Sequence, residues 1–388
     1  QDMLSAQLSG REIARLRRDV GASDPLYPAL TKAARAFKAG EDEEPEARTL
    51  PRDDLAAAAD DLYQALYDGV PRSHPHARRL TRLMLDCMWY ARRHGEFDEA
   101  QSRLLTAPEG KFLEATLLCV DPSAHLETCL SRVGGTVFFS ATLTPAAFYA
   151  DALRVREENG DALLSLASPF PPENQLTLLM ETPTRFRERE NTLNEVVRAI
   201  HEMARAKPGN YIACFPSHAY LAMAYERFLT AFSDVRAIRQ SPRMDEAARA
   251  AFIEAFQPAP ETSMVAFIAM GGVFAEGIDL PGERLIGAAI VTVAIPQICR
   301  EREVLREMHD DGEDGGYDCA YVFPGFRRVL QAAGRVIRTE TDRGVVLLID
   351  ERFAQEKYIA LMPANWRVNK VDGAEGVRRA VARFWRGG

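Results

Sequence analysis

Residues 331–338 have the sequence QAAGRVIR, and the apolar run GVVLLID follows closely at residues 344–350. If the first segment is helical, Gln331, Arg335 and Arg338 fall at positions i, i+4 and i+7 and share one face. Guanidinium groups are permanently charged, and their planar fork of donors suits phosphate oxygens. The apolar run favours a strand, so the expected helix lies against a sheet and offers a site for a highly charged anion. A solvated helix face with two incidental arginines is the alternative.

The second half of the chain alternates between expected strands and helices. Strands are expected at residues 176–180, 211–215, 235–239, 264–270, 285–293 and 345–349, and helices at residues 195–206, 219–232 and 245–256. This alternation predicts a mostly parallel sheet with helices on both faces. Open sheets of this kind bind ligands at the carboxyl ends of their strands, so polar residues that directly follow the strands are candidate site residues.

Three segments carry such residues. The apolar run at residues 135–139, which we expect to be a buried strand, ends in Ser-Ala-Thr, although helix capping is the favoured interpretation of these hydroxyls when they are taken alone. The strand at 211–215 ends in Phe-Pro-Ser-His. Residues 270–282 are rich in glycine, which lets backbone N–H groups approach a ligand, but they match neither the dinucleotide nor the P-loop pattern. Besides the residues of 331–338, the candidates are Ser140 and Thr142, then Phe215, Ser217 and His218, and then Glu276, Gly277 and Asp279.

Composition narrows the class of protein. The chain has 388 residues, of which 47% are hydrophobic, so two or three domains with real cores are expected. The net charge of −8 argues against a generic nucleic-acid coat but leaves room for a local basic groove. None of the six cysteines are spaced CxxC, so we expect reduced, buried thiols and no metal site. No apolar run approaches the roughly 18 residues of a membrane span, and we expect a cytoplasmic protein without membrane partners.

Taken together, these motifs resemble the DinG/XPD family of superfamily 2 helicases. They occur in that family's order: Ser140-Ala141-Thr142 is similar to motif III, Phe215-Pro216-Ser217 to motif IV, residues 276–279 (EGID) to motif V, and residues 331–338 to motif VI. Residues 342–353 are similar to the closing strand of the family. The resemblance covers roughly residues 106–365.

The resemblance implies an α/β fold with three regions. Residues 168–388 would form a RecA-like parallel sheet module, helicase domain 2, which begins at the proline-rich linker SPFPP. Residues 106–167, with an expected strand at 111–120, would be the tail of a first RecA-like module. Residues 1–105 look helical and lie where the family inserts its α-helical arch domain.

The resemblance also implies roles for the candidate residues. ATP would bind between two RecA-like modules, with Gln331, Arg335 and Arg338 reaching it as catalytic residues. Residues Glu276, Gly277 and Asp279, with Ser140 and Thr142, would link the state of the nucleotide to domain movement. Phe215, Ser217 and His218 would lie near single-stranded DNA. The expected function is ATP hydrolysis coupled to 5′–3′ translocation on single-stranded or forked DNA and to duplex unwinding, as in DNA repair.

The chain also departs from the family pattern. It has no Walker A lysine loop and no Asp-Glu-x-His box, the parts that hold phosphates and Mg²⁺ in the first module. The four-cysteine iron–sulfur site of many family members cannot be assembled here either. We therefore expect the C-terminal portion of a longer helicase, inactive alone, whose partner is an upstream helicase domain 1 that supplies the Mg²⁺ ligands and, in some members, an iron–sulfur cluster. The alternatives are a non-catalytic scaffold that binds nucleic acid or protein, and an unrelated α/β enzyme.

Overall fold

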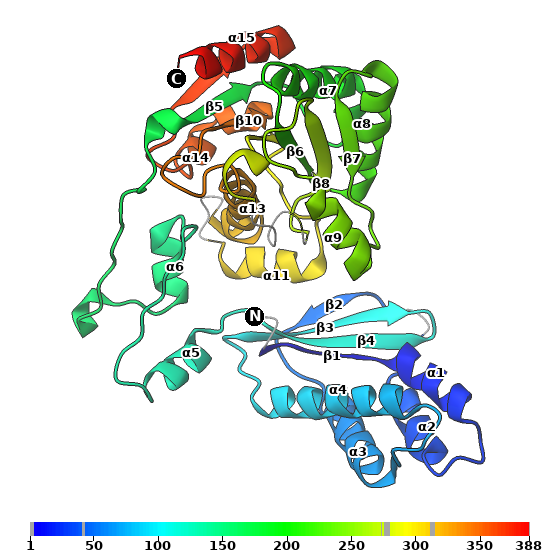
Figure 1. The fold of residues 1–388 in the computed structure, drawn as a ribbon. Coiled ribbons are helices and arrows are strands. Elements are labelled where there is room, and N and C mark those ends of the chain that lie inside the picture. The colour runs from blue at the N-terminus through cyan, green and yellow to red at the C-terminus, as the bar shows by residue number, and fades with distance from the viewer. Residues whose placement is uncertain (1–3, 41–42, 273, 275–279, 311–314, 388) are drawn as a thin grey trace. The chain divides into compact units, whose positions relative to one another are not determined.

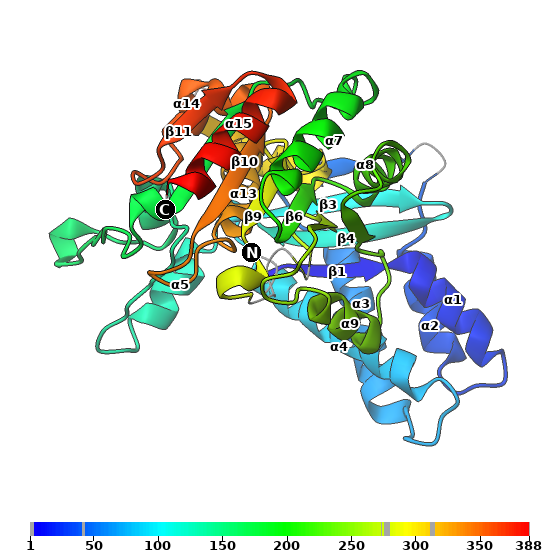
Figure 2. The same cartoon turned by 45° about the horizontal axis from the view of Figure 1, so that its top comes forward.

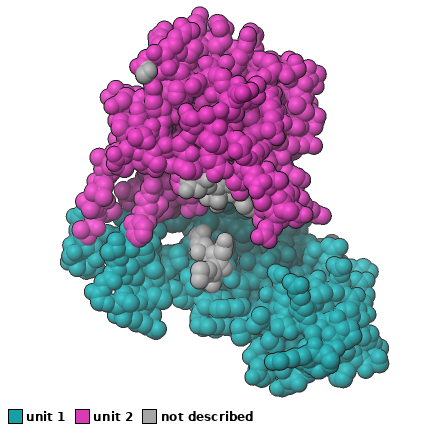
Figure 3. Space-filling view, viewed as in Figure 1, with its two compact units in different colours: residues 1–138, 150–161, 298–316 teal, residues 139–149, 162–297, 317–388 magenta. Residues whose placement is uncertain are grey.

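The computed structural model describes residues 4–40, 43–272, 274, 280–310 and 315–387. This part of the chain forms two compact units, each assembled from three segments (Figure 3). Unit 1 consists of residues 1–138, 150–161 and 298–316, and unit 2 of residues 139–149, 162–297 and 317–388. None of the described helices is both long and apolar enough to cross a membrane.

Unit 2 is built on a seven-stranded sheet in which every neighbouring pair of strands is parallel. The strand order is β11-β5-β10-β9-β6-β8-β7. Strands β5, β10, β6, β8 and β7 are labelled in Figure 1. The strands are β5 (Gln175–Met180), β6 (Asn210–Phe215), β7 (Arg236–Arg239), β8 (Met264–Ala269), β9 (Gly287–Val291), β10 (Gly344–Ile349) and β11 (Val368–Val371). The parallel α/β sheet that the alternating pattern predicts is confirmed.

Helices cover both faces of this sheet. They are α7 (Arg189–Arg205), α8 (His218–Ala231), α9 (Glu246–Glu254), α13 (Phe323–Ala333), α14 (Glu356–Ile359) and α15 (Gly373–Arg386). Tyr211 and Phe215 pack into a core with α7, α8 and α15, whereas Ile212 and Cys214 pack into a core with α9 and α13. Both views of the fold show α15 beside α7 (Figures 1 and 2). Because the central strands are buried on both faces, they read as continuous apolar runs in the sequence.

Unit 1 combines helices with a small antiparallel sheet of order β1-β4-β3-β2. Its strands are β1 (Ala6–Ser9), β2 (Glu46–Arg48), β3 (Ser102–Glu109) and β4 (Phe112–Cys119), and its helices are α1 (Gly10–Val20), α2 (Tyr27–Ala36), α3 (Asp53–Gly69), α4 (Ala77–Gly95), α5 (Ser123–Leu130) and α11 (Arg300–Met308). Two short helices, α6 (Ala146–Ala152) and α12 (Gly315–Tyr317), span the division between the units. Helices α1 to α4 share one core with β1, β3 and β4.

Helix α11 joins unit 1 although it lies far along the chain. Its Val304 packs against Leu105, Leu118 and Val120 of the small sheet and its continuation. The guanidinium of Arg300 donates a hydrogen bond to the carbonyl of Thr106 at 2.9 Å. Sequence patterns alone gave no sign of this long-range contact.

Two features differ from the sequence-based expectations. The strand expected at residues 111–120 exists as β4, but it pairs with β1 and β3, so the boundary expected at residue 106 falls inside the β3–β4 hairpin. The buried strand expected at residues 135–139 is wrong: the segment has no regular structure, and its residues are exposed. A strand is stable only when its N–H and C=O groups pair with neighbours, and the described chain provides no strand beside this segment.

Candidate functional site

The helix expected through residues 331–338 ends early. Helix α13 stops at Ala333, and Gly334 donates its N–H to the carbonyl of Leu330 at 2.9 Å. The next two N–H groups, of Arg335 and Val336, bond three residues back at 3.3 and 3.1 Å, which closes a tight turn. The prediction that Gln331, Arg335 and Arg338 share one helical face is therefore wrong, because only Gln331 is on the helix.

A buried carboxylate fixes the loop that follows. Asp342 accepts the backbone N–H of Arg338 at 2.7 Å and of Thr339 at 2.8 Å, and its other oxygen accepts the Thr339 hydroxyl at 2.6 Å. The side chain of Asp342 is 6% exposed, so these hydrogen bonds are shielded from water. Residues 334–343 lead directly into β10 and thus stand at its amino end.

The candidate side chains around this turn differ in exposure. Arg338 is exposed, whereas Gln331 and Arg335 are half-buried. The Oε1 atom of Gln331 is buried, and no donor in the described part of the chain reaches it. A buried amide oxygen without a partner is costly, so this atom is suited to accept a hydrogen bond from a ligand or a neighbouring domain.

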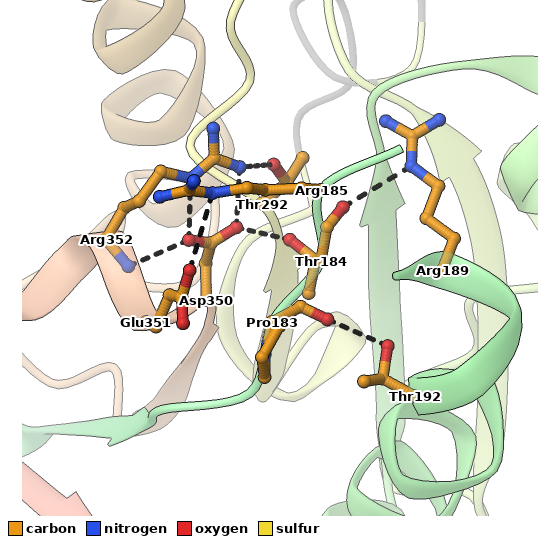
Figure 4. A network of polar contacts seen from close by, with 9 residues as sticks. All are labelled: Pro183, Thr184, Arg185, Arg189, Thr192, Thr292, Asp350, Glu351 and Arg352. Carbon is orange, nitrogen blue, oxygen red and sulfur yellow. Dashed lines mark hydrogen bonds and ion pairs between the residues drawn. The ribbon is translucent and has the colours of Figure 1, made fainter. Parts of the chain in front are cut away.

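A second polar network lies at the opposite, carboxyl ends of the strands (Figure 4). Asp350 directly follows β10, has no exposed surface, and accepts from the Nε of Arg352 at 2.8 Å and its Nη2 at 2.7 Å. The hydroxyl of Thr184, beyond β5, also donates to Asp350. Arg352 in turn donates to the hydroxyl of Thr292, beyond β9, at 2.8 Å. Although burial acts to lower it, the bonds to Asp350 raise the pKa of Arg352.

Arg189, at the start of α7, borders this network. Its Nε atom donates to the carbonyl of Thr184 at 3.4 Å (Figure 4). The guanidinium carbon lies 4.8 Å from the ring centre of Tyr220 and 5.4 Å from that of Phe186. Burial, together with the positive charge of Arg352, lowers the pKa of Arg189. The residues from Thr184 to Arg189 were missed by the sequence analysis, although arginines interleaved with phenylalanine directly after a strand were a usable signal.

The motif IV residues are placed at the end of β6, but they face different environments. Phe215 is fully buried and lies 5.2 Å from the ring of Tyr220 and 5.8 Å from that of Phe267. Its ring is thus part of the core and cannot touch DNA, which corrects the expectation for this residue. The hydroxyl of Ser217 caps α8 by accepting the N–H of Tyr220 at 3.3 Å. His218 is half-buried, and its Nδ1 has no partner among the described residues.

The remaining candidates are only partly visible. Ser140 and Thr142 form a local turn in which the Ser140 hydroxyl accepts the N–H of Thr142 at 3.2 Å. Glu276, Gly277 and Asp279 lie outside the described residues. Just before them, Gly271 follows β8 with φ of 74°, and a Cβ there would lie 3.1 Å from the Nε of Arg328.

The candidate residues therefore lie at two different edges of the sheet of unit 2. Ser217 and His218 follow β6, and the Asp350 network follows β5, β9 and β10, so all stand at the carboxyl edge. Arg335 and Arg338 stand at the amino end of β10. Within the described chain, no group of three His, Cys, Asp or Glu side chains is placed to hold a metal ion.

Comparison with known proteins finds matches in both sequence and fold. Residues 200–369 match the family model of the helicase C-terminal domain. The chain superimposes on the solved structure "XPD_APO" with a TM-score of 0.58 at 15% identity, covering 95% of this chain and 74% of that one. Xpd4 of S. tokodaii gives 0.57 at 12% identity, with coverages of 95% and 72%. At these identities the structures show a shared fold.

Curated relatives match in sequence. The probable ATP-dependent helicase MJ0942 of Methanocaldococcus jannaschii is 26% identical over 257 residues, which cover 62% of this chain and 38% of the relative. The human regulator of telomere elongation helicase 1 is 26% identical over 332 residues, covering 76% and 26%. The mouse ATP-dependent DNA helicase DDX11 is 22% identical over 306 residues, covering 70% and 33%. The chain thus spans well under half the length of these relatives.

Fold and sequence together define the class: unit 2 is a RecA-like helicase C-terminal domain. More narrowly, the matches in sequence and fold make the chain similar to the C-terminal portion of DinG/XPD-like helicases of superfamily 2.

Proposed function

We propose that the chain supplies the second motor domain of an ATP-dependent DNA helicase that moves 5′–3′ along single-stranded DNA and unwinds duplexes. The observation that carries this proposal is the presence of phosphate-compatible side chains at opposite edges of one parallel sheet. Arg335 and Arg338 stand at the amino end of β10, and Ser217 and His218 stand at the carboxyl edge. The relatives' names, ATP-dependent helicase and ATP-dependent DNA helicase, support the assignment.

At the amino edge, Gln331, Arg335 and Arg338 would contact ATP. The two guanidiniums would stabilise the negative charge that develops on the transferring phosphoryl group, an effect worth roughly 10³- to 10⁵-fold in rate. The buried Oε1 of Gln331 would accept a hydrogen bond when the two motor domains close. Asp342 contributes by fixing the backbone at Arg338, because a mobile arginine loses most of its catalytic effect.

The chain's own residues account for only half of a nucleotide site. Because the sequence contains neither a Walker A loop nor an Asp-Glu-x-His box, helicase domain 1 would hold the phosphates and Mg²⁺. This chain alone would then bind DNA without hydrolysing ATP. Ser140 and Thr142, with Glu276, Gly277 and Asp279, would couple the nucleotide site to domain movement.

At the carboxyl edge, single-stranded DNA would be held through its phosphates. The Ser217 hydroxyl, the His218 ring and the first backbone N–H groups of α8 suit phosphate oxygens, which carry no sequence information. Translocation without sequence preference requires contacts of this kind.

Arginine variants test the nucleotide half of the proposal. In a protein that joins helicase domain 1 to this chain, Arg335→Ala and Arg338→Ala are expected to abolish DNA-stimulated ATP hydrolysis while leaving the thermal unfolding temperature unchanged. Arg379→Ala, which removes an exposed arginine on α15, is the matched control and should retain full turnover. Normal turnover in both motif VI variants would contradict the proposal. DNA binding without hydrolysis in the wild-type protein would favour the non-catalytic scaffold instead.

A further inference from the structure

Phe186 presents an unusually open aromatic ring on unit 2. It lies in the segment between β5 and α7, and its side chain is 82% exposed. A single exposed apolar side chain needs no explanation by itself. Here, however, the ring lies at the carboxyl edge of the sheet, within a short run of arginines, and one of these arginines contacts it.

Three arginines lie close to Phe186 along the chain: Arg185, Arg187 and Arg189. Arg185 forms an ion pair with Glu351 at 3.4 Å, but the two side chains are 58% and 39% exposed, so the pair is weak and readily exchanged. Arg187 is exposed, and in the described part of the chain it has no ion-pair partner. The acidic residues Glu188 and Glu190 flank Arg189 at the start of α7, and Arg185 and Arg187 are the positive charges ahead of the helix.

Arg189 makes a cation–π contact with the ring of Phe186. Its guanidinium lies over Phe186 at 5.4 Å and over Tyr220 at 4.8 Å, and Nε is tied to the carbonyl of Thr184. Cation–π contacts at exposed sites are weakly attractive, so the contact with Arg189 favours one orientation of the ring. Because one face of Phe186 meets Arg189 and most of the side chain is exposed, the other face is open to solvent.

We infer that Phe186 is a stacking platform for one base of single-stranded nucleic acid, with Arg185 and Arg187 contacting the adjacent phosphates. This inference rests on the proposed function and adds to it a base contact that motif IV does not provide, because the Phe215 ring is buried. Stacking on an aromatic face tolerates every base, while arginines follow the backbone. Successive bases would stack on the ring one after another as the nucleic-acid strand moves past it.

The first test measures binding of a dye-labelled oligothymidylate to the whole chain by fluorescence polarisation. Phe186→Ala is expected to weaken binding by about 5- to 100-fold, the range for loss of one stacked base. Phe186→Trp should bind at least as tightly as the wild type. The control Tyr67→Ala removes a ring that is 66% exposed in unit 1 and should not alter affinity. Because Phe186 contributes little to the core, the alanine variant should fold normally.

Two further readouts separate stacking from charge. Arg187→Ala should reduce the magnitude of the slope of log affinity against log salt concentration by about 1, the value for one lost phosphate contact. Phe186→Ala should leave that slope unchanged. An oligonucleotide with 5-iodouracil should photocrosslink to Phe186 and fail to do so in Phe186→Ala. Wild-type affinity in Phe186→Ala, or crosslinking only elsewhere, would overturn the inference while leaving the proposed function intact. Failure of the wild-type chain to bind the oligonucleotide at all would overturn both.

Discussion

Asp342 and Asp350 stand at opposite ends of the same strand, β10, and each carboxylate orders the loop beside it. Asp342 holds the backbone of Arg338 and Thr339 ahead of the strand, and Asp350 holds Arg352 and Thr184 beyond it. Both are buried, at 6% and 0% exposure. The strand thereby connects the proposed nucleotide edge to the proposed DNA edge through a rigid backbone, as a motor that couples the two requires.

Removing the first carboxylate should loosen the nucleotide edge. Asp342→Asn replaces one acceptor oxygen with an amide NH₂ that faces N–H donors, so the free energy of unfolding should fall by about 1.5–3 kcal/mol. Chemical denaturation measures this change. Glu340→Ala, which removes an exposed carboxylate from the same loop, is the control and should shift stability by less than about 0.5 kcal/mol. Equal stability of Asp342→Asn and the wild type would show that the loop is not held in this way.

Removing the Asp350 carboxylate should lower the free energy of unfolding more than the Asp342 substitution does. Asp350→Ala leaves the Arg352 guanidinium, whose side chain is 16% exposed, without its buried partner. Breaking a buried pair in this way costs about 3–5 kcal/mol. The double variant Asp350→Ala/Arg352→Met should recover part of that loss, since it removes the unpaired charge as well. If the double variant were less stable than the single one by the full cost of Arg352→Met, the pair would not be coupled.

The burial of Phe215 predicts a structural role for its ring. Phe215→Leu should lower the free energy of unfolding by roughly 1–3 kcal/mol and Phe215→Ala by about 3–5 kcal/mol, as expected for a shrinking side chain in a packed core. DNA affinity of the folded fraction should stay at the wild-type value, in contrast to Phe186→Ala. A selective loss of DNA affinity in Phe215→Leu, without loss of stability, would show that the ring reaches the DNA.

Stability should also depend on pH through Asp234. The hydrogen bond from His201 Nε2, at 2.8 Å, is the main cause that lowers the pKa of Asp234. A carboxyl whose folded-state pKa is depressed stabilises the protein above its ordinary pKa of about 4, and that contribution is lost as the pH falls through the folded-state pKa. Denaturation midpoints of wild type and Asp234→Asn should therefore differ at pH 6 and converge in stronger acid. A difference that persists unchanged in strong acid would rule out this linkage.

The sheet was predictable from sequence because its central strands are buried on both faces and read as apolar runs bounded by turn residues. The arrangement of the candidate site residues was less predictable from the sequence. Whether α13 continues past Ala333 depends on hydrogen bonds of Gly334 and on the carboxylate of Asp342, which periodicity does not register. Phe215 is the last residue of β6, a strand that is buried on both faces, so its ring packs into the core and not toward solvent. The Asp350 network joins residues more than 150 positions apart, a separation that no local pattern reveals.

We propose above that this chain contributes the second half of an ATP-driven motor. The most direct test is DNA-stimulated ATP hydrolysis by the chain alone and by the chain combined with a helicase domain 1 that carries the Walker A and Asp-Glu-x-His motifs. We expect hydrolysis only in the combination, and we expect it to be lost again when Arg335 or Arg338 is replaced by alanine. Hydrolysis by the chain alone, or none in the combination despite intact DNA binding, would contradict the proposal.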